Sequence, residues 1–300
     1  MASSFLNKLF YYECWTVAWR RIPDSMGYPC DGDDPEYTVV PCEGDHWEAD
    51  PFLFEYGNDL FLFTEYMPLH SNHGSISVRK FSKDHFGLPD IVLRTDSHLS
   101  YPDVFSYNGR IYMIPESLNS RTVDLYECTD FPGKWEKKST LISGRAFVDT
   151  TVHVQDGKCV LFLYDPDEPA HKEQKLYMAE LDPESGTISS PVLLQTYSEK
   201  LGRPAGEPFS HNGTRVRPTQ DCRKLYGGSV RYMEYELSDD GYSEKECGTL
   251  SATSVRSDLD HIPCGVHTVN RRKDIEVIDL FYRKFSIFKP FRALLARLNK

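Results

Sequence analysis

The chain has 300 residues, of which 40% are hydrophobic and 26% are charged, so it can bury a substantial core and is not disordered by composition. Lys and Arg total 34 against 45 Asp and Glu, a net charge of -11, which argues against a nucleic-acid binder because such proteins usually present a basic face. Aromatic residues reach 13%, and most of them are expected in strand cores, with a sugar-stacking cleft as the functional alternative.

The N-terminal segment and the cysteines bear on the compartment. Asn7 and Lys8 interrupt the first apolar stretch, so no secretory signal peptide is predicted. The sequence has no run of about 18 apolar residues, the length that a membrane-spanning helix requires. The 8 cysteines include no C-x-x-C pair and no Cys/His metal spacing. These features predict a cytoplasmic protein with reduced thiols.

A repeated pattern begins at residues 47–56, which open an apolar strand with a carboxylate, Asp50, near its start. After a turn at 57–58, further strands are expected over 59–66 and 74–81. The pattern returns at 98–116, where Tyr101-Pro102 superposes on Asp50-Pro51 and an Asn-Gly turn again leads into an apolar strand. Such self-similarity is the signature of a repeat architecture.

Later units open at 147, 203 and 264, so that unit starts fall about fifty residues apart, in the range of propeller blades. The fifth unit lacks a strand, which residues 16–20 would supply to close a ring. A β-sandwich would not explain why each unit begins with a polar residue followed by a hairpin. We predict an all-β fold, a single five-bladed β-propeller over residues 1–285. Its blades are expected near 46–96, 98–143, 146–196, 201–251 and 261–285 plus 14–22.

A series of short motifs runs through these units in a fixed order. They are W-x-A-D-P-F, H-L-S-Y-P, Y-M-I-P-E, V-D-T-T, R-P-A-G, R-P-x-Q-D-C, Y-G and G-x-H-T. The ordered set resembles the N-terminal domain of glucosamine inositolphosphorylceramide transferases and its bacterial stand-alone relatives, across residues 15–282. More remotely it is similar to the five-bladed propellers of furanosidases and fructan-processing enzymes. The resemblance implies a carbohydrate-active or glycan-biosynthetic role.

The first residues of each innermost propeller strand lie at one mouth of the central channel. The titratable residues that open the blades are therefore expected to converge there: Asp50, Asp103, Asp149, Glu207 and His267. Like charges held close together move their pKa values apart, so that one carboxylate acts as a base or nucleophile and another as an acid. Glycosyl transfer and glycoside hydrolysis both use such a pair.

The furanosidase-like propellers place a base on the first blade, a pKa-modulating Asp on a middle blade and an acidic Glu on the following one. By resemblance these roles fall on Asp50, Asp149 and Glu207, with Glu116 as a competing acid. Structural alternatives remain open, because Asp50 would also suit a turn before Pro51 and Asp149 would also bond neighbouring backbone amides.

A second group is expected to bind substrate. Arg203 and Arg217 would hold a phosphate bidentately, or would instead neutralise the acidic funnel. The other candidate substrate-binding residues are His98, Tyr101, Asp103, Gln220, Asp221, Tyr226 and His267. Carboxylates together with His267 would also suit a Ca²⁺ ion in the channel, although no sequential Ca²⁺ loop is visible.

Residues 286–300 differ in kind, with apolar side chains on one predicted helical face and basic ones on the other. A basic amphipathic helix is typical of a membrane-surface contact; a helix docked across the propeller is the alternative.

The leading hypothesis is a bacterial glycosyltransferase of capsule-like surface polysaccharide or glycolipid assembly, peripheral on the inner face of the membrane. It would move a sugar from a nucleotide- or lipid-phosphate donor to a glycan or glycolipid acceptor. A glycoside hydrolase and a non-catalytic glycan-binding propeller are the alternatives.

Overall fold

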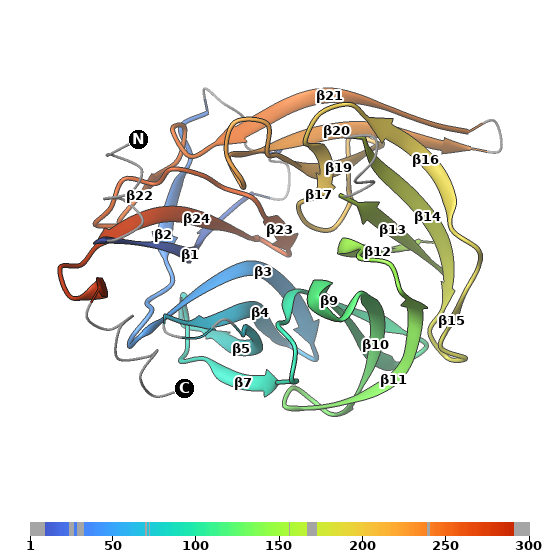
Figure 1. Ribbon diagram of the computed structural model, residues 1–300, viewed down its shortest axis with the longest axis horizontal. Coiled ribbons are helices and arrows are strands. Elements are labelled where there is room, and N and C mark those ends of the chain that lie inside the picture. Colours follow the sequence, from blue (N-terminus) through green and yellow to red (C-terminus); the bar gives the residue numbers. More distant parts are fainter. Residues whose placement is uncertain are drawn as a thin grey trace.

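The computed structural model describes residues 10–23, 27–28, 33–69, 71, 73–155, 157–166, 173–238 and 241–290. Within these ranges the strands form five sheets arranged as blades around a central axis (Figure 1). The predicted all-β, five-bladed propeller is therefore confirmed.

Four blades follow one another along the chain, and each extends from an innermost strand by antiparallel pairing. Blade 1 contains β3 (His46–Tyr56), β4 (Asp59–Pro68), β5 (Ser75–Ser82), β6 (His85–Phe86) and β7 (Asp90–Leu93). Blade 2 contains β8 (Ser100–Tyr107), β9 (Arg110–Ser117), β10 (Thr122–Asp130) and β11 (Lys134–Ser143). Blade 3 contains β12 (Val148–Gln155), β13 (Lys158–Asp165), β14 (Gln174–Asp182), β15 (Thr187–Ile188) and β16 (Val192–Tyr197). Blade 4 contains β17 (Leu201–Pro204), β18 (Phe209–His211), β19 (Thr214–Asp221), β20 (Ser229–Ser238) and β21 (Gly241–Ser251).

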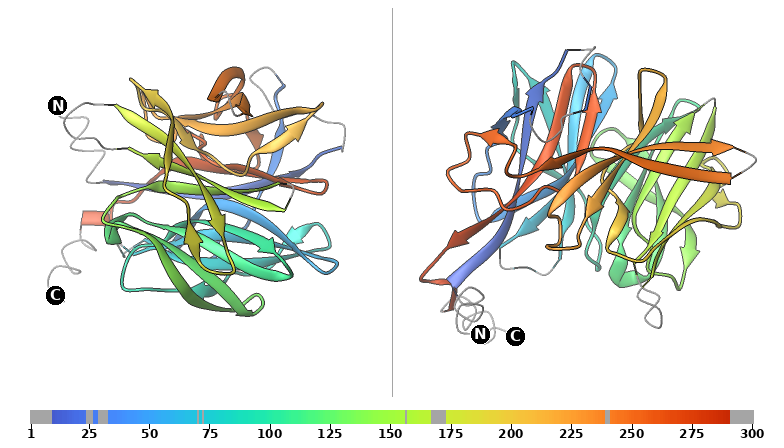
Figure 2. Two further views of the ribbon diagram at one scale, coloured as in Figure 1. Left: turned by 90° about the vertical axis from the view of Figure 1, so that its right-hand side faces the viewer. Right: turned by 90° about the horizontal axis from the view of Figure 1, so that it is seen from above.

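The fifth blade is assembled from both ends of the described chain. It contains β23 (Val269–Arg272), β24 (Ile275–Phe285), β1 (Tyr11–Arg21), β2 (Glu36–Val39) and β22 (Arg256–Ser257). β1 pairs with β24 along its whole length, from Tyr11 opposite Phe285 to Arg21 opposite Ile275, and Figure 2 shows the two strands side by side. The strand expected at 16–20 therefore does close the ring.

The helix predicted over 286–300 lies mostly outside the described residues, which end at Pro290. Before that point the chain turns at Ile287 and Phe288 and is helical only at Lys289 and Pro290. Among the described residues, no helix has both the length and the apolar character that crossing a bilayer requires. The seven described cysteines are all unpaired with one another.

Hydrophobic cores fill the spaces between neighbouring blades, because alternate residues of each strand face opposite sides of the sheet. Phe52 and Phe63 of blade 1 are 1% and 0% exposed and pack with Val104 and Met113 of blade 2. Full burial of one such side chain stabilises the fold by about 1.5–3 kcal/mol. These interblade cores fix the inner strands in place around the axis.

Three innermost strands carry the same backbone irregularity. Asp50, Tyr101 and Asp149 have φ values of +50°, +45° and +46°, and each lies within a register shift against the next strand of its blade. A left-handed conformation at a non-glycine residue costs of order 1–3 kcal/mol, and a bulge re-aims its side chain. The side chains at these positions consequently reach across to other blades.

Candidate active site

Asp50 lies at the start of the inner strand of blade 1 and is 5% exposed. Its carboxylate accepts a hydrogen bond from the backbone N–H of Tyr101 at 3.1 Å and one from the hydroxyl of Thr268 at 3.0 Å. Burial raises the pKa of Asp50 to about 6, although the nearby His267 imidazole opposes this rise. A carboxylate with such a pKa is ionised at pH 7 and remains basic enough to accept a proton efficiently.

His267 connects Asp50 to a second carboxylate. Its Nδ1 is 2.6 Å from Oδ2 of Asp279, and its Nε2 is 3.8 Å from Oδ1 of Asp50. The Trp15 ring stacks on the imidazole with ring centroids 3.8 Å apart. Burial opposes the charged form of the imidazole, but Asp279 and Asp50 together raise the pKa of His267. The resulting imidazolium offsets the negative charge of the two carboxylates.

Asp149 of blade 3 is held by a cation and an amide from blade 4. Nε and Nη2 of Arg203 donate to its two oxygens, and Nε2 of Gln220 donates to Oδ2 at 2.6 Å. Burial alone would raise the pKa of Asp149, but the Arg203 guanidinium holds it below its usual range. A permanently ionised, fully bonded carboxylate is a poor proton acceptor, so Asp149 positions Arg203.

Glu116 of β9 shares the same guanidinium, since Nη2 of Arg203 lies 3.1 Å from its Oε2. The backbone N–H of Asp149 donates to this oxygen at 3.0 Å. Burial and the neighbouring Asp149 carboxylate raise the pKa of Glu116 well above its usual range. Glu116 therefore does lie with Asp50 and Asp149, as a group able to hold a proton near neutral pH. These three residues define what we call the acidic end of the axis.

Glu65 of β4 is a further buried acid at this end. Its Oε1 lies 3.3 Å from Nε2 of His98, whose Nδ1 accepts a hydrogen bond from the backbone N–H of Gly74 at 2.8 Å. That acceptor role places the imidazole proton on Nε2, facing Glu65. Burial, followed by the charge of Asp50, raises the pKa of Glu65 well above its usual range, and burial lowers the pKa of His98. His98 thus borders the site as a neutral side chain.

A cavity of about 230 Å³ adjoins the acidic end beside Arg203. It is lined by Tyr164, Pro166, Gln174, Lys200, Arg203, Cys222 and Tyr226. Tyr226 is 52% exposed, and the Arg203 guanidinium lies 5.5 Å from the centre of its ring. Nη1 of Arg203 has no hydrogen-bond partner among the described residues, nor does Lys200 form an ion pair with any of them. The cavity therefore offers two cations and an exposed aromatic ring.

The expectation that Glu207 and Asp103 join this cluster is wrong. Glu207 forms a two-pronged ion pair with Nη2 of Arg272 at 2.7 and 3.0 Å, in a separate pocket at the other end of the axis. The carboxylate of Asp103 accepts from the backbone N–H of Val152 at 2.6 Å. Glu207 follows the end of β17 at Pro204 and a bend at Gly206, and its side chain lines the pocket at the opposite end from Arg203.

Tyr101 does not offer its ring to a sugar, contrary to the prediction. Its side chain is completely buried, and it lies edge-on to Phe52. The hydroxyl accepts a hydrogen bond from the backbone N–H of Gly206 at 2.8 Å and bonds the Thr151 hydroxyl at 2.9 Å. The side chain therefore spans from blade 2 to blades 3 and 4 and separates the acidic end from the opposite end.

Arg217 and Asp221 are also excluded from the site. Arg217 is 1% exposed and donates to Glu244 at 2.6 Å, Tyr197 at 3.0 Å and the Gly202 carbonyl at 2.9 Å. The strand period of two places Arg217 and Asp221 on the face of β19 opposite to Gln220. Both residues thus serve as structural ion-pair partners, Asp221 with Arg223 and Arg231.

One set of side chains has donor atoms close enough to hold a metal ion at the acidic end. Oxygens of Asp50 and Asp279 and a nitrogen of His267 lie within 4.8 Å of one another. All four carboxylate oxygens, however, accept hydrogen bonds from protein groups, including the backbone N–H groups of His267 and Thr268. Hydrogen bonds within the protein therefore already satisfy these oxygens. A Ca²⁺ ion, by contrast, prefers six to eight oxygen ligands.

Sequence reasoning missed Asp279, Thr268 and Trp15. A signal for Asp279 exists, because it interrupts the apolar run 277–281, and a carboxylate there requires a buried partner. No local signal identifies Trp15, which meets His267 only because the first and last described strands pair.

The chain is similar to a described protein family over most of its length. Residues 41–262 match the family model described as "Glucosamine inositolphosphorylceramide transferase 1, N-terminal". The curated protein of that name from Oryza sativa subsp. indica is 34% identical over 219 residues, covering 69% of this chain and 29% of the relative. Its counterpart from Arabidopsis thaliana is 32% identical over 207 residues, covering 66% and 27%. The chain spans less than a third of the length of these relatives.

Solved structures with a similar fold include glycoside hydrolases. The catalytic domain of a GH62 α-L-arabinofuranosidase from Coprinopsis cinerea superposes with a TM-score of 0.57 at 12% identity, covering 90% of this chain and 98% of that one. An endo-arabinase from Bacteroides thetaiotaomicron gives a TM-score of 0.57 at 14% identity, covering 79% and 93%. At such identities the likeness concerns the fold alone.

Proposed function

The chain belongs to the family of the glucosamine inositolphosphorylceramide transferase 1 N-terminal region, and from this premise we propose that it acts as a glycosyltransferase. The observation that carries the proposal is the placement of Asp50, with a pKa of about 6, at the acidic end next to the cavity lined by Lys200, Arg203 and Tyr226. A base and a cavity lined by cations are the two elements that transfer from a sugar phosphate requires.

In the proposed step, Asp50 removes the proton from an acceptor hydroxyl. That oxygen forms a bond to the anomeric carbon of the donor sugar while the bond from this carbon to the phosphate oxygen breaks. Nη1 of Arg203 and Nζ of Lys200 would bind the departing phosphate, and Asp149 keeps the guanidinium in place. The donor is a nucleotide- or lipid-phosphate sugar, and the acceptor a glycan or glycolipid.

A second candidate is glycoside hydrolysis with the same base. The raised pKa of Glu65, caused by burial and nearby carboxylates, favours it, because a protonated carboxyl can supply the general acid that a neutral sugar leaving group needs. Glycoside hydrolysis releases no phosphate, so it does not require Lys200 and Arg203 as phosphate ligands. This difference makes the two functions separable by experiment.

The test is thermal stabilisation by a panel of nucleotide sugars and lipid-phosphate sugars. We expect one donor class to raise the melting temperature of the wild type, and Lys200→Ala to weaken this effect. Lys245→Ala, an exposed lysine of β21 in the same blade, serves as the matched control and should behave as the wild type. Absence of a response to every activated donor, with cleavage of free oligosaccharides that Asp50→Asn abolishes, would establish the hydrolase. Binding of oligosaccharides that Asp50→Asn leaves intact would indicate a non-catalytic glycan-binding propeller.

We also propose that the protein contacts an anionic membrane surface from the cytoplasmic side. Phe285, Ile287 and Phe288 are 55%, 54% and 61% exposed near the end of the described chain, and the basic Arg283, Lys284 and Lys289 lie among them. Exposed apolar side chains flanked by cations suit an anionic lipid surface. Vesicles of anionic lipid should co-sediment with the wild type and less with Phe288→Asp, whereas equal sedimentation would refute the contact.

A further inference from the structure

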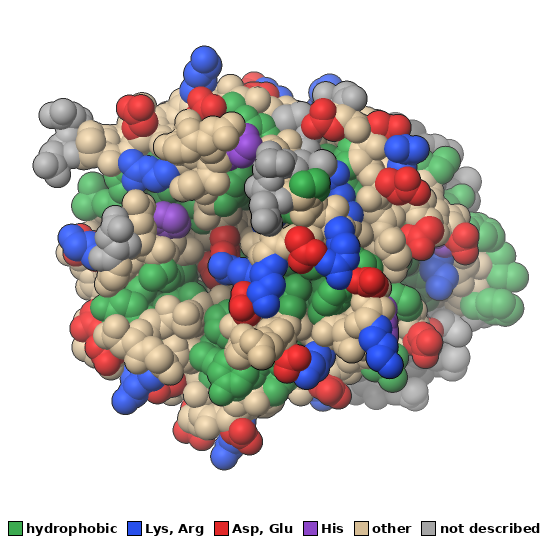
Figure 3. Space-filling view, turned by 180° about the vertical axis from the view of Figure 1, so that it is seen from behind, with side chains coloured by type: hydrophobic (Ala, Val, Ile, Leu, Met, Phe, Trp, Pro, Cys, Tyr) green, Lys and Arg blue, Asp and Glu red, His purple; other side chains and the backbone are tan. Residues whose placement is uncertain are grey.

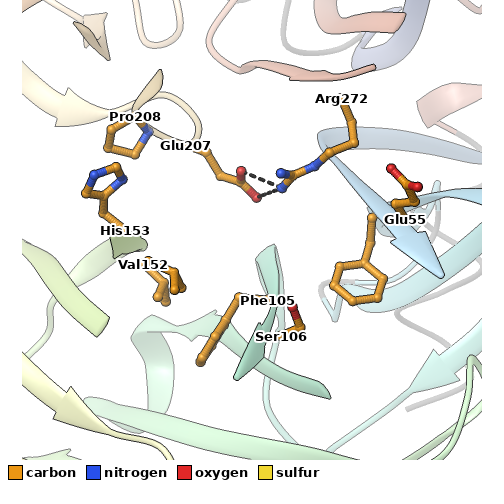
Figure 4. A pocket seen from close by; sticks show the side chains of 10 residues that line it. Glu55, Phe105, Ser106, Val152, His153, Glu207, Pro208 and Arg272 are labelled. Carbon is orange, nitrogen blue, oxygen red and sulfur yellow. Dashed lines mark hydrogen bonds and ion pairs between the residues drawn. The ribbon is translucent and has the colours of Figure 1, made fainter. Parts of the chain in front are cut away.

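A pocket of about 350 Å³ opens at the end of the axis opposite to Asp50. Its walls come from all five blades, and they consist of Phe54, Glu55, Phe105, Ser106, Val152, His153, Val154, Glu207, Pro208 and Arg272. Figure 4 shows the Glu207–Arg272 pair on one side of the pocket and Phe105, Val152 and His153 around the rest. Pockets for small ligands begin at about 300 Å³, so this one has the size for one or two sugar rings.

One buried polar atom of the pocket lining has no hydrogen bond with any described residue. It is Nε of Arg272; Oδ1 of Asp103, a fully buried side chain outside the lining, is unpaired as well. Burying a polar group without a partner costs about 1–3 kcal/mol, so such atoms are uncommon unless a ligand or water completes them. The pocket therefore has both the space and the unsatisfied hydrogen-bonding capacity of a binding site.

The charges at the pocket select the class of ligand. Glu207 is paired with Arg272, and Glu55 is paired with Nζ of Lys273 at 3.0 Å. Burial lowers the pKa of His153, which is therefore neutral. An anion would have to compete with Glu207 for Arg272, and a cation would have to compete with Arg272 for Glu207. Acidic and basic side chains surround a central hollow on the face seen in Figure 3, consistent with this balance.

We propose that this pocket binds a neutral sugar residue, at a site separate from the acidic end. Adjacent sugar hydroxyls both donate and accept, so they can bond the Glu207 carboxylate and the Arg272 guanidinium without disturbing the pair. Phe54 and Phe105, which are 5% and 6% exposed, line the pocket with the small accessible part of their apolar surface. Because Tyr101 separates the two ends, this inference does not depend on the reaction proposed for Asp50.

Saturation-transfer NMR and calorimetry on the full chain test this site. The probes are glucose, galactose, mannose, arabinose and N-acetylglucosamine, with glucuronate, glucosamine and inorganic phosphate as charged comparators. Val154→Trp, at a residue 42% exposed on the pocket wall, should fill the pocket without unfolding the protein. Val192→Trp, at a residue 57% exposed on β16, is the matched control.

We expect at least one neutral sugar to bind, with affinity reduced roughly tenfold or more by Val154→Trp and by Glu207→Gln. Val192→Trp and Asp50→Asn should leave this affinity unchanged. The proposal is overturned if no neutral sugar binds, if the charged comparators bind more tightly, or if the affinity falls with Asp50→Asn and not with Val154→Trp. The Asp50→Asn arm also separates this site from the donor site, since only the latter bears on the proposed transfer.

Discussion

Replacing Asp50 with Asn should stabilise the protein at neutral pH while removing the proposed transferase activity. The pKa of Asp50 rises from 3.8 to about 6 on burial, so the folded state favours the protonated form. Between these two values the folded protein binds more protons than the unfolded chain, and its stability therefore falls as pH rises through that window. At about 1.4 kcal/mol per pKa unit, keeping Asp50 ionised at pH 7 costs about 3 kcal/mol.

Asparagine fits this position with no more backbone strain than aspartate. It tolerates the left-handed conformation found at φ +50°. Its side-chain oxygen can accept the Tyr101 N–H, and its amide can donate to the Thr268 hydroxyl, which accepts as well as donates. The stabilisation by Asp50→Asn should thus be near zero at pH 3.5 and approach about 3 kcal/mol at pH 7.

Urea unfolding at a series of pH values measures this difference. Asp90→Asn, at an exposed carboxylate of β7, is the matched control and should show no comparable trend. The reasoning is refuted if Asp50→Asn is no more stable than the wild type at pH 7, or if its advantage is independent of pH. Loss of activity with unchanged stability would mean that Asp50 is not held in an environment that disfavours its charge.

Three further predictions concern the acidic end: one pH dependence and two substitutions. The reaction rate should rise with pH through about 6, because Asp50 must lose its proton to act as a base; a rate that falls over this range in initial-velocity measurements would exclude that role. Arg203→Gln should destabilise the fold by about 3–5 kcal/mol, since it leaves Asp149 and Glu116 buried without their cation, and a urea midpoint equal to that of the wild type would contradict this. Tyr101→Phe should cost about 1–3 kcal/mol in unfolding free energy through the unpaired Gly206 N–H; a variant as stable as the wild type in urea unfolding would refute this.

The propeller could be predicted from sequence because each unit contains its own hairpin signals. Apolar runs separated by Gly-Asn or Asn-Gly turns specify local pairing, and their recurrence specifies the ring. The order of the blades also follows from chain order. The closing strand was predictable for a simpler reason, since the fifth unit lacked one and the N-terminal segment supplied it.

The site was predicted only in part, because the register of the inner strands is not visible in sequence. Asp50, Tyr101 and Arg203 each precede a proline, and all three lie at or just beside the acidic end. In blade 4 both Arg203 and Glu207 precede a proline, so this step alone does not choose between them. A bulge changes which face a side chain occupies, and the bulges emerge only from the folded backbone. Contacts between blades, such as Asp279 with His267, are likewise invisible to local patterns.

The acidic end holds more buried carboxyl groups than buried cations, and this excess determines which carboxyl groups keep a proton at neutral pH. Five carboxyl groups gather there against the cations of Arg203 and His267; they are Asp50, Glu65, Glu116, Asp149 and Asp279. Two cations cannot balance five buried negative charges, so some carboxyls must retain protons at neutral pH. The Arg203 guanidinium lowers the pKa of Asp149, burial raises the pKa of Glu65 and of Glu116 well above the usual range, and the pKa of Asp50 lies between these extremes. One cluster therefore holds carboxyls of raised pKa together with a carboxylate fixed by Arg203, the groups that the proposed reactions would use.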